Sequence, residues 1–216
     1  MKTLKLGLVL LVLAGAGAAQ AGRVSLGFWE GQRDVGYLYY FSFFVSTISA
    51  LEGGAYLHWD VADNLGLRFQ AAYLKGSSSN SETDIYRNSE YKYELTGFPV
   101  QLQVLPTARV GDRLVLRAGA GLTYYKLTGK GSNVSGSTTT FLPQHGVTGF
   151  GGQLLLTAEG KLNKNIGLEA QYEKGTAKLS YTYIWTPGGG GSPPTTEKVS
   201  FGLPTEAYRL GLAFHF

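Results

Sequence analysis

The sequence predicts an all-β fold, an eight-stranded antiparallel up-and-down transmembrane β-barrel. Three observations indicate it: strict alternation at the carboxyl terminus, tight turns at regular intervals, and long flexible connections between those turns. In the last ten residues every second position is apolar or aromatic, namely Tyr208, Leu210, Leu212, Phe214 and Phe216. This period belongs to a strand with two unlike faces, and about ten residues let a tilted strand cross a bilayer. The alternative, an edge strand of a soluble β-sandwich, need not end on an aromatic residue.

The amino-terminal segment predicts export. Two early lysines precede a short apolar run at residues 6–16, and Ala-Gln-Ala follows at positions 19–21, with small residues where a signal peptidase would cut. We therefore expect a signal peptide over residues 1–21 and the barrel over residues 22–216. The chain has no cysteine, which excludes disulfides, thiolate metal sites and lipid attachment through cysteine. Its net charge is +4, two charges of which come from the predicted signal peptide, so we expect no nucleic-acid partner.

Compact turns divide the mature chain at intervals of roughly fifty residues. They are Ala62-Asp63-Asn64, Val110-Gly111-Asp112-Arg113 and Asn163-Lys164-Asn165. Asp, Asn and Gly permit the backbone angles that tight hairpins require. Longer polar or flexible connections separate these turns, at residues 77–88, 129–145 and 187–196. Short turns on one side and long loops on the other are typical of a transmembrane barrel. Three turns and four loops predict eight strands, with both termini on the side of the short turns.

Each predicted strand shows the same alternation. The outward, lipid-facing positions recur at every second residue, and in chain order the eight series begin at Val24, Ala55, Leu65, Val100, Leu114, Leu154, Ile166 and Tyr208. Two further segments, residues 179–185 and 199–203, alternate in the opposite parity. We therefore expect bulges at Gly175 and Pro204, and an exposed ribbon that continues beyond the membrane. The aromatic first loop, residues 35–50, could extend strand one, cover the barrel mouth or lie against the membrane.

Charged residues fall on the inward faces of these strands. The set is His58, Asp60, Arg68, Arg117, Glu159, Lys161, Glu169, Glu173 and Arg209. Such groups are costly in lipid, whereas inside a barrel they can neutralise one another. We interpret them as a structural interior network, and we expect Arg68, Arg117, Glu159 and Glu169 to lie within salt-bridge reach, because an unpaired buried charge is destabilising.

The whole mature chain resembles the small eight-stranded outer-membrane barrels of the OmpA/OmpX/OmpW type. The export signal, the asymmetry of turns and loops, and the terminal aromatic residue carry this resemblance. It implies a monomer in the bacterial outer membrane with both termini in the periplasm. It also implies two partners, outer-membrane lipid and the barrel assembly machinery, which would recognise the terminal strand. A structural or surface-interaction role through the loops, with a possible extracellular partner, is the first hypothesis. A narrow conduit for small hydrophobic molecules, as in OmpW-like proteins, is the second.

The third hypothesis is a membrane-embedded enzyme that modifies lipid A, since eight-stranded barrels include such enzymes. The sequence disfavours it. His58 and Asp60 share an inward face with no serine assigned nearby, His145 lies in a predicted loop, and His215 is penultimate. We expect no catalytic residue, cofactor site or specific metal site. Two acidic pairs could bind a cation weakly: Glu30 with Asp34, and Glu82 with Asp84.

Overall fold

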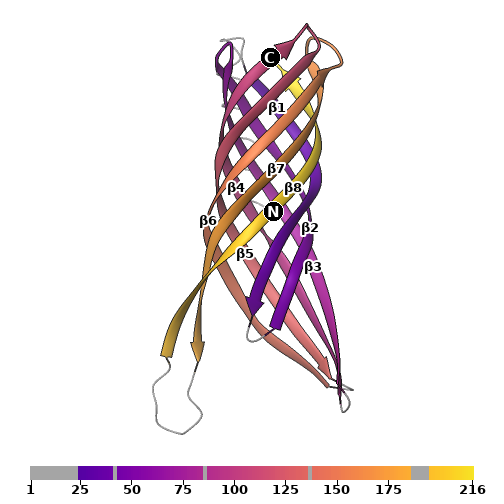
Figure 1. Cartoon of the computed structure of the whole chain (residues 1–216), viewed down its shortest axis with the longest axis vertical. Coiled ribbons are helices and arrows are strands. Elements are labelled where there is room, and N and C mark those ends of the chain that lie inside the picture. Colours follow the sequence, from indigo (N-terminus) through magenta and orange to yellow (C-terminus); the bar gives the residue numbers. More distant parts are fainter. Residues whose placement is uncertain (1–23, 41–42, 85–86, 136–137, 186–194) are drawn as a thin grey trace.

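The protein is a single closed β-barrel of eight antiparallel strands joined in sequential order (Figure 1). The computed structural model describes residues 24–40, 43–84, 87–135, 138–185 and 195–216, so the predicted signal peptide lies outside the described residues. The strands are β1 (Val24–Tyr40), β2 (Phe43–Ala62), β3 (Leu65–Asp84), β4 (Arg87–Val110), β5 (Leu114–Ser135), β6 (Thr138–Lys161), β7 (Ile166–Trp185) and β8 (Thr195–His215). The predicted all-β, eight-stranded, up-and-down architecture is confirmed. In the described part of the chain, no helix has the length and apolar character to span a membrane.

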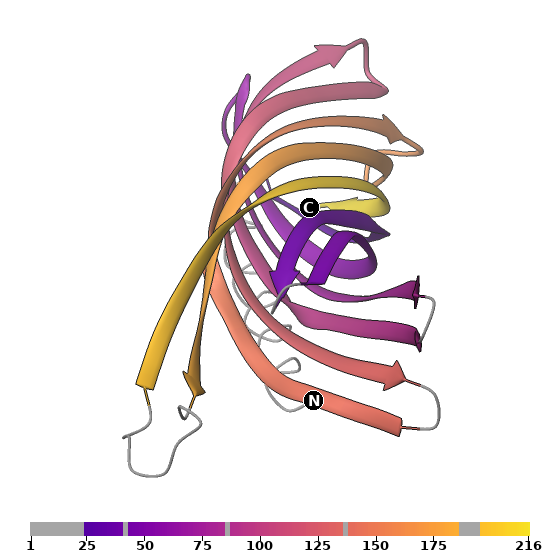
Figure 2. The same ribbon diagram turned by 60° about the horizontal axis from the view of Figure 1, so that its bottom comes forward.

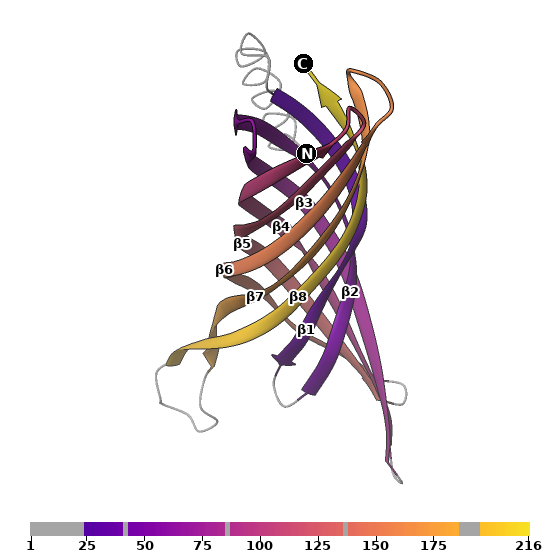
Figure 3. The same cartoon turned by 45° about the horizontal axis from the view of Figure 1, so that its top comes forward.

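The strands are strongly tilted, as Figure 3 shows. One row of backbone partners can be followed around the barrel from Ser25 on β1 through β2 to β8, and it returns to β1 at Val35, ten residues further on. The shear of the barrel is therefore ten residues. Barrels with this relation between strand number and shear tilt their strands by about 35–45°, and eight strands leave an interior that side chains can fill.

The three predicted turns all lie at the end of the barrel where the chain terminates (Figure 1). Gly111, between β4 and β5, has a positive φ of 62°, a conformation that a residue with a Cβ adopts only at a cost. In the turn between β6 and β7, the Asn163 side-chain oxygen accepts hydrogen bonds from the backbone N–H groups of Asn165 (2.8 Å) and Ile166 (2.9 Å). These local geometries explain why Gly and Asn occupy the turns.

Two of the predicted long connections, residues 77–88 and 129–145, are largely strand, which corrects the sequence-based expectation, whereas most of the third, residues 187–196, lies outside the described residues. β3 continues to Asp84 and β4 begins at Arg87, while β5 continues to Ser135 and β6 begins at Thr138. The first loop likewise extends strand one, because β1 reaches Tyr40 and pairs with β2 out to that residue. Ser-, Thr- and Gly-rich sequence reads as loop, yet in a hairpin the neighbouring backbone satisfies the same hydrogen-bonding groups.

The predicted bulges at Gly175 and Pro204 are wrong. β7 and β8 pair without a register shift from Ile166↔Phe214 to Trp185↔Thr195. Leu179 and Leu203 therefore point into the barrel, on the same face as the charged residues closer to the turns, and both are about 1% exposed. The strand keeps its parity, and it is the interior that changes from polar to apolar along the axis. Val24, which the alternation places outward, is also buried, at 3% exposure.

A broad apolar belt covers the outer face of the barrel. Large hydrophobic side chains such as Leu102, Leu122, Leu154 and Leu210 are 56–70% exposed. Three outward aromatic pairs lie within this surface, with ring centroids 5.1–5.2 Å apart: Tyr73–Phe98, Tyr124–Phe150 and Tyr172–Tyr208. A monomeric soluble protein rarely exposes so large a contiguous apolar surface, whereas a membrane barrel requires it.

At the end opposite the turns, the barrel separates into three groups of strands (Figure 2). β1 and β8 pair only as far as Val35↔Thr205, β2 and β3 as far as Ala50↔Gly76, and β6 and β7 as far as Thr148↔Ser180. Beyond these pairs the β1–β2 hairpin, the β3–β6 sheet and the β7–β8 hairpin continue separately. Pro204 directly precedes Thr205, the first residue of β8 that pairs with β1, and so lies at an edge position that a residue without an N–H group tolerates.

Candidate functional site in the barrel interior

A closed ring of four ion pairs crosses the middle of the barrel. We call Arg33, Glu52, Glu173 and Arg209 the central cluster. Each arginine contacts both glutamates, at 2.6–2.8 Å, and each glutamate contacts both arginines. The four side chains are only 0–1% exposed. They come from β1, β2, β7 and β8, so the two ends of the chain are joined inside the barrel as well as along its wall.

Residues from the opposite wall complete the central cluster. Arg33 Nη1 donates to the Tyr125 hydroxyl (3.2 Å), and Gln101 Nε2 donates to Glu173 (3.1 Å). The guanidinium of Arg209 lies 4.4 Å from the centre of the Trp29 ring. The cluster is electrically neutral and spans the lumen from β1 to β4 and β5. Its two positive and two negative charges therefore compensate one another where solvent is excluded.

A second cluster lies closer to the turns and contains four of the predicted residues. We call Arg68, Arg117, Glu159 and Glu169 the turn-side cluster. Arg68 binds Glu169 through two nitrogens at 2.6 and 2.7 Å. Arg117 contacts Glu159 at 2.9 Å and Glu169 at 3.4 Å. His215, from the terminal strand, contacts Glu159 at 2.5 Å. The bidentate pair fixes the geometry of both partners, and strands β3, β5, β6, β7 and β8 meet through this cluster.

Two glycines make space for the turn-side cluster. A Cβ added at Gly27 would lie 2.2 Å from the Tyr56 ring, and that ring stacks on the Arg68 guanidinium at 3.9 Å. A Cβ at Gly167 would lie 2.5 Å from a carboxylate oxygen of Glu159. These inward positions must therefore lack a side chain for the ion pairs to form.

The remaining predicted charges lie at the mouth of the barrel near the turns. His58 is 2% exposed and contacts Asp60 at 2.9 Å, and Asp60 also contacts Arg109 at 3.0 Å. Lys161 is half-buried and has no ion-pair partner among the described residues. Ser25 is the register partner of His58, so a serine does lie on the neighbouring strand, but within the described ranges no hydrogen bond joins the two side chains.

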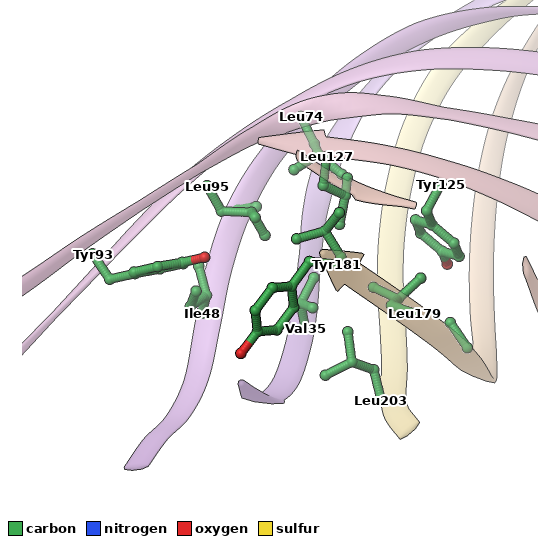
Figure 4. Close-up of a cluster of buried hydrophobic side chains, with 13 residues drawn as sticks. Val35, Ile48, Leu74, Tyr93, Leu95, Tyr125, Leu127, Leu179, Tyr181 and Leu203 are labelled. Carbon is green, nitrogen blue, oxygen red and sulfur yellow. The ribbon is translucent and has the colours of Figure 1, made fainter. Parts of the chain in front are cut away.

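An apolar core lies in the interior beyond the central cluster, on the side away from the turns, and Figure 4 shows its side chains. We call it the outer core. Its members are Val35, Ile48, Ala50, Leu74, Tyr93, Leu95, Tyr125, Leu127, Val147, Ala177, Leu179, Tyr181 and Leu203. All eight strands contribute to it. The interior thus has three layers in order along the axis: the turn-side cluster, the central cluster and the outer core.

Comparison with known proteins addresses the fold. No family model and no curated protein matches the chain. Among solved structures, the outer membrane protein OprG of Pseudomonas aeruginosa is 12% identical, with 90% of this chain and 97% of that chain covered and a TM-score of 0.53. The chain has the fold of the small outer-membrane β-barrels. Two other barrels match at lower TM-scores. Neisserial surface protein A is 12% identical (89% and 97% covered, TM-score 0.49), and the attachment invasion locus protein Ail of Yersinia pestis is 12% identical (90% and 99% covered, TM-score 0.43).

Within this outer-membrane barrel fold, two members of the central cluster were not among the residues predicted from the sequence. Arg33 and Glu52 lie beyond the predicted limits of the first two strands, in segments that read as the start and end of a loop. Continuing the inward parity of Trp29 along β1, and of His58 along β2, would have placed both side chains in the lumen. On β7 and β8 the outer core was missed because the inward apolar residues Leu179 and Leu203 were interpreted as a change of parity.

Proposed function

We propose that the protein is a monomeric integral protein of the bacterial outer membrane, with both termini in the periplasm. The apolar belt of exposed leucines and paired aromatic rings supports this location. The folded barrel should migrate faster on gels when unheated than when boiled, and its circular dichroism should be that of β-structure. A mainly helical spectrum would refute the assignment.

Its role, we propose, is surface interaction through the outer ends of the strands, and not transport. The outer core carries this proposal. β4 and β6 have 24 residues each, whereas a tilted strand crosses a bilayer in about 9–11. The packed apolar interior stabilises these long strands beyond the membrane. There they form a stem that presents three groups of strands to the exterior.

The β7–β8 hairpin is the best candidate for partner contact. In the described parts of the hairpin beyond Ser180 on β7 and before Thr205 on β8, neither edge pairs with a neighbouring strand. Free edges can capture another extended chain by strand addition. Deleting all of residues 178–203 would also remove Leu179, Tyr181 and Leu203 from the outer core, so the test should be narrower.

A narrower deletion separates binding from folding. Thr182 and Lys198 are register partners, and replacing residues 183–197 with an Asn-Gly turn would close the hairpin there. We expect normal assembly, with lost adhesion to surfaces or cells that the unmodified protein binds. If the barrel of this variant fails to assemble, the hairpin tip has a structural role. If the variant assembles and adhesion is unchanged, the hairpin tip is not the contact with the partner.

The filled interior supports the absence of an open channel. The two ion-pair clusters and the outer core occupy successive levels of the lumen, so purified protein in planar bilayers should remain silent. We also propose no catalytic role, since among the described residues no hydrogen bond joins the Ser25 hydroxyl to the His58 ring. The mass spectrum of lipid A should be unchanged by expression of the protein, and an altered spectrum would indicate an enzyme.

A conduit for small hydrophobic molecules is the second candidate. The apolar lining of the outer interior and the ending of β6–β7 pairing at Thr148↔Ser180 favour it. Together they would let an apolar molecule enter from outside and leave sideways into lipid. Accelerated transfer of a small apolar dye into vesicles that contain the barrel would support this function over the first.

A further inference from the structure

Three lysines on alternate strands project from the outer face of the barrel. Lys75 lies on β3, Lys126 on β5 and Lys178 on β7, and all three are exposed. None of the ion pairs between described residues involves any of the three. We call them the lysine ring.

The register places the lysine ring at one height. From Lys75 the row of backbone partners runs through Thr96 to Thr128, and Lys126 lies two residues nearer the turns. From Lys126 the row runs through Thr148 to Ser180, and Lys178 again lies two residues nearer the turns. A shear of ten residues over eight strands raises such a row by about two and a half residues every two strands. The two-residue steps compensate for this rise, so the three lysines are level.

Aromatic pairs lie directly beside the lysine ring. Tyr73 precedes Lys75 by two residues on the same outward face, and Tyr124 precedes Lys126 in the same way. Lys126 is the register partner of Phe98, and Lys178 is that of Phe150. The pairs Tyr73–Phe98 and Tyr124–Phe150 therefore lie between and below the lysines. Outward aromatic rings mark the boundary between hydrocarbon and headgroups, so the ammonium groups lie at headgroup level, with their stems along apolar surface.

No carboxylate is a direct register partner of the lysine ring, and Glu94, two residues from Thr96 on the outer face of β4, has Lys130 as its own partner. The register partners of the three lysines are all uncharged: Leu51, Thr96, Phe98, Thr148, Phe150 and Gly202. Lys174, which is also outward and follows Tyr172 by two residues, differs in this respect. Its register partner on β8 is Glu206, which accepts hydrogen bonds from the hydroxyls of Tyr172 and Tyr208 at 2.7 Å each. The chain thus contains its own matched contrast between lysines without and with a carboxylate as register partner.

We infer that the lysine ring binds the phosphate groups of lipids in the leaflet that surrounds it. The occupant is a membrane lipid with a phosphate-bearing anionic headgroup, its chains lying along the belt below the aromatic pairs. Unpaired cations at headgroup level attract anionic lipid, and ammonium groups bind phosphate oxygens as charge-assisted donors. The inference rests on the membrane location proposed above and adds a lipid preference to it.

The test compares lipid composition around the barrel. The protein would be reconstituted in nanodiscs of phosphatidylcholine and phosphatidylglycerol, and the bound lipids counted by native mass spectrometry. Wild type should enrich phosphatidylglycerol, by about fivefold for a lipid at one lysine, and less at high salt. The triple variant Lys75→Gln, Lys126→Gln, Lys178→Gln should lose this enrichment, while Lys174→Gln should keep it.

Separate readouts distinguish the possible failures. Failure of wild type to enter nanodiscs or to shift on unheated gels would count against the membrane location itself. Equal enrichment in wild type and the triple variant, with both correctly inserted, would overturn the lysine ring as the binding site. Inorganic phosphate, added in detergent without lipid, should leave the thermal stability unchanged. A rise in thermal stability on adding free phosphate would show that the lysine ring is a site for phosphate anions in general and not a lipid site.

Discussion

Glu173→Gln is the most informative perturbation of the interior. The carboxylate accepts ion-pair contacts from Arg33 and Arg209 at 2.8 Å each, and its side chain is fully buried. The substitution preserves shape but removes one negative charge from a neutral cluster. Two arginines would then share Glu52 as their only carboxylate within the central cluster.

The expected cost follows from this uncompensated charge. Breaking a buried ion pair by removing one partner typically destabilises by about 3–5 kcal/mol. The double variant Arg33→Gln, Glu173→Gln restores neutrality and leaves Arg209 with Glu52, which lie 2.6 Å apart. It should therefore be more stable than the sum of the single effects implies, with a coupling of about 0.5–3 kcal/mol.

The free energy of unfolding would be measured by urea titration in lipid vesicles. Gel mobility reports the folded fraction, and tryptophan fluorescence is a second probe of unfolding to which Trp29, which stacks on Arg209, contributes with Trp59 and Trp185. Glu94→Gln, at an exposed position on β4, is the matched control and should change stability by about 0.5 kcal/mol or less. Single variants that cost less than about 1 kcal/mol, together with strict additivity in the double variant, would refute the idea of one coupled cluster.

Three further predictions concern the other layers and the terminal strand. Glu159→Gln removes one of the two carboxylates of the turn-side cluster and should destabilise the barrel or open a small conductance; unchanged stability with a silent membrane would mean that these charges are solvated separately. Leu179→Ala removes a side chain that is 1% exposed in the outer core and should cost about 2–5 kcal/mol in the urea titration, whereas Leu154→Ala, at a position 70% exposed on the belt, should cost much less. Deleting Phe216 should lower the amount of assembled barrel in membranes, and normal membrane levels would argue against recognition of the terminal aromatic residue.

Local features of the chain predicted the architecture. Alternation in the terminal strand and Asn- or Gly-containing turns depend on neighbours in sequence, and they indicated eight strands, their order and the shared side of the turns. The inward parity of Arg68, Arg117, Glu159 and Glu169 followed from counting outward from those turns. For these residues a period of two was sufficient, because the polar interior contrasts with the apolar exterior.

The outer half of the barrel could not be predicted in the same way. Leu179 and Leu203 are apolar and face inward, whereas Lys178 is polar and faces outward. Beyond the membrane the contrast between the two faces is reversed, so the same alternation suggested a change of parity and two bulges that do not exist. The predicted strands were also too short, because serine- and glycine-rich hairpins have no outward apolar face that marks them as strands.

The sequence by itself determined that the chain forms a barrel, how many strands it has, and which residues could face lipid. Only the tertiary structure decided the three interior layers, the partners of each charge and the level of the lysine ring. The physical reason is closure. Arg33, Glu52, Glu173 and Arg209 meet because β8 pairs with β1, and the lysines become level because shear and register act together around the whole barrel.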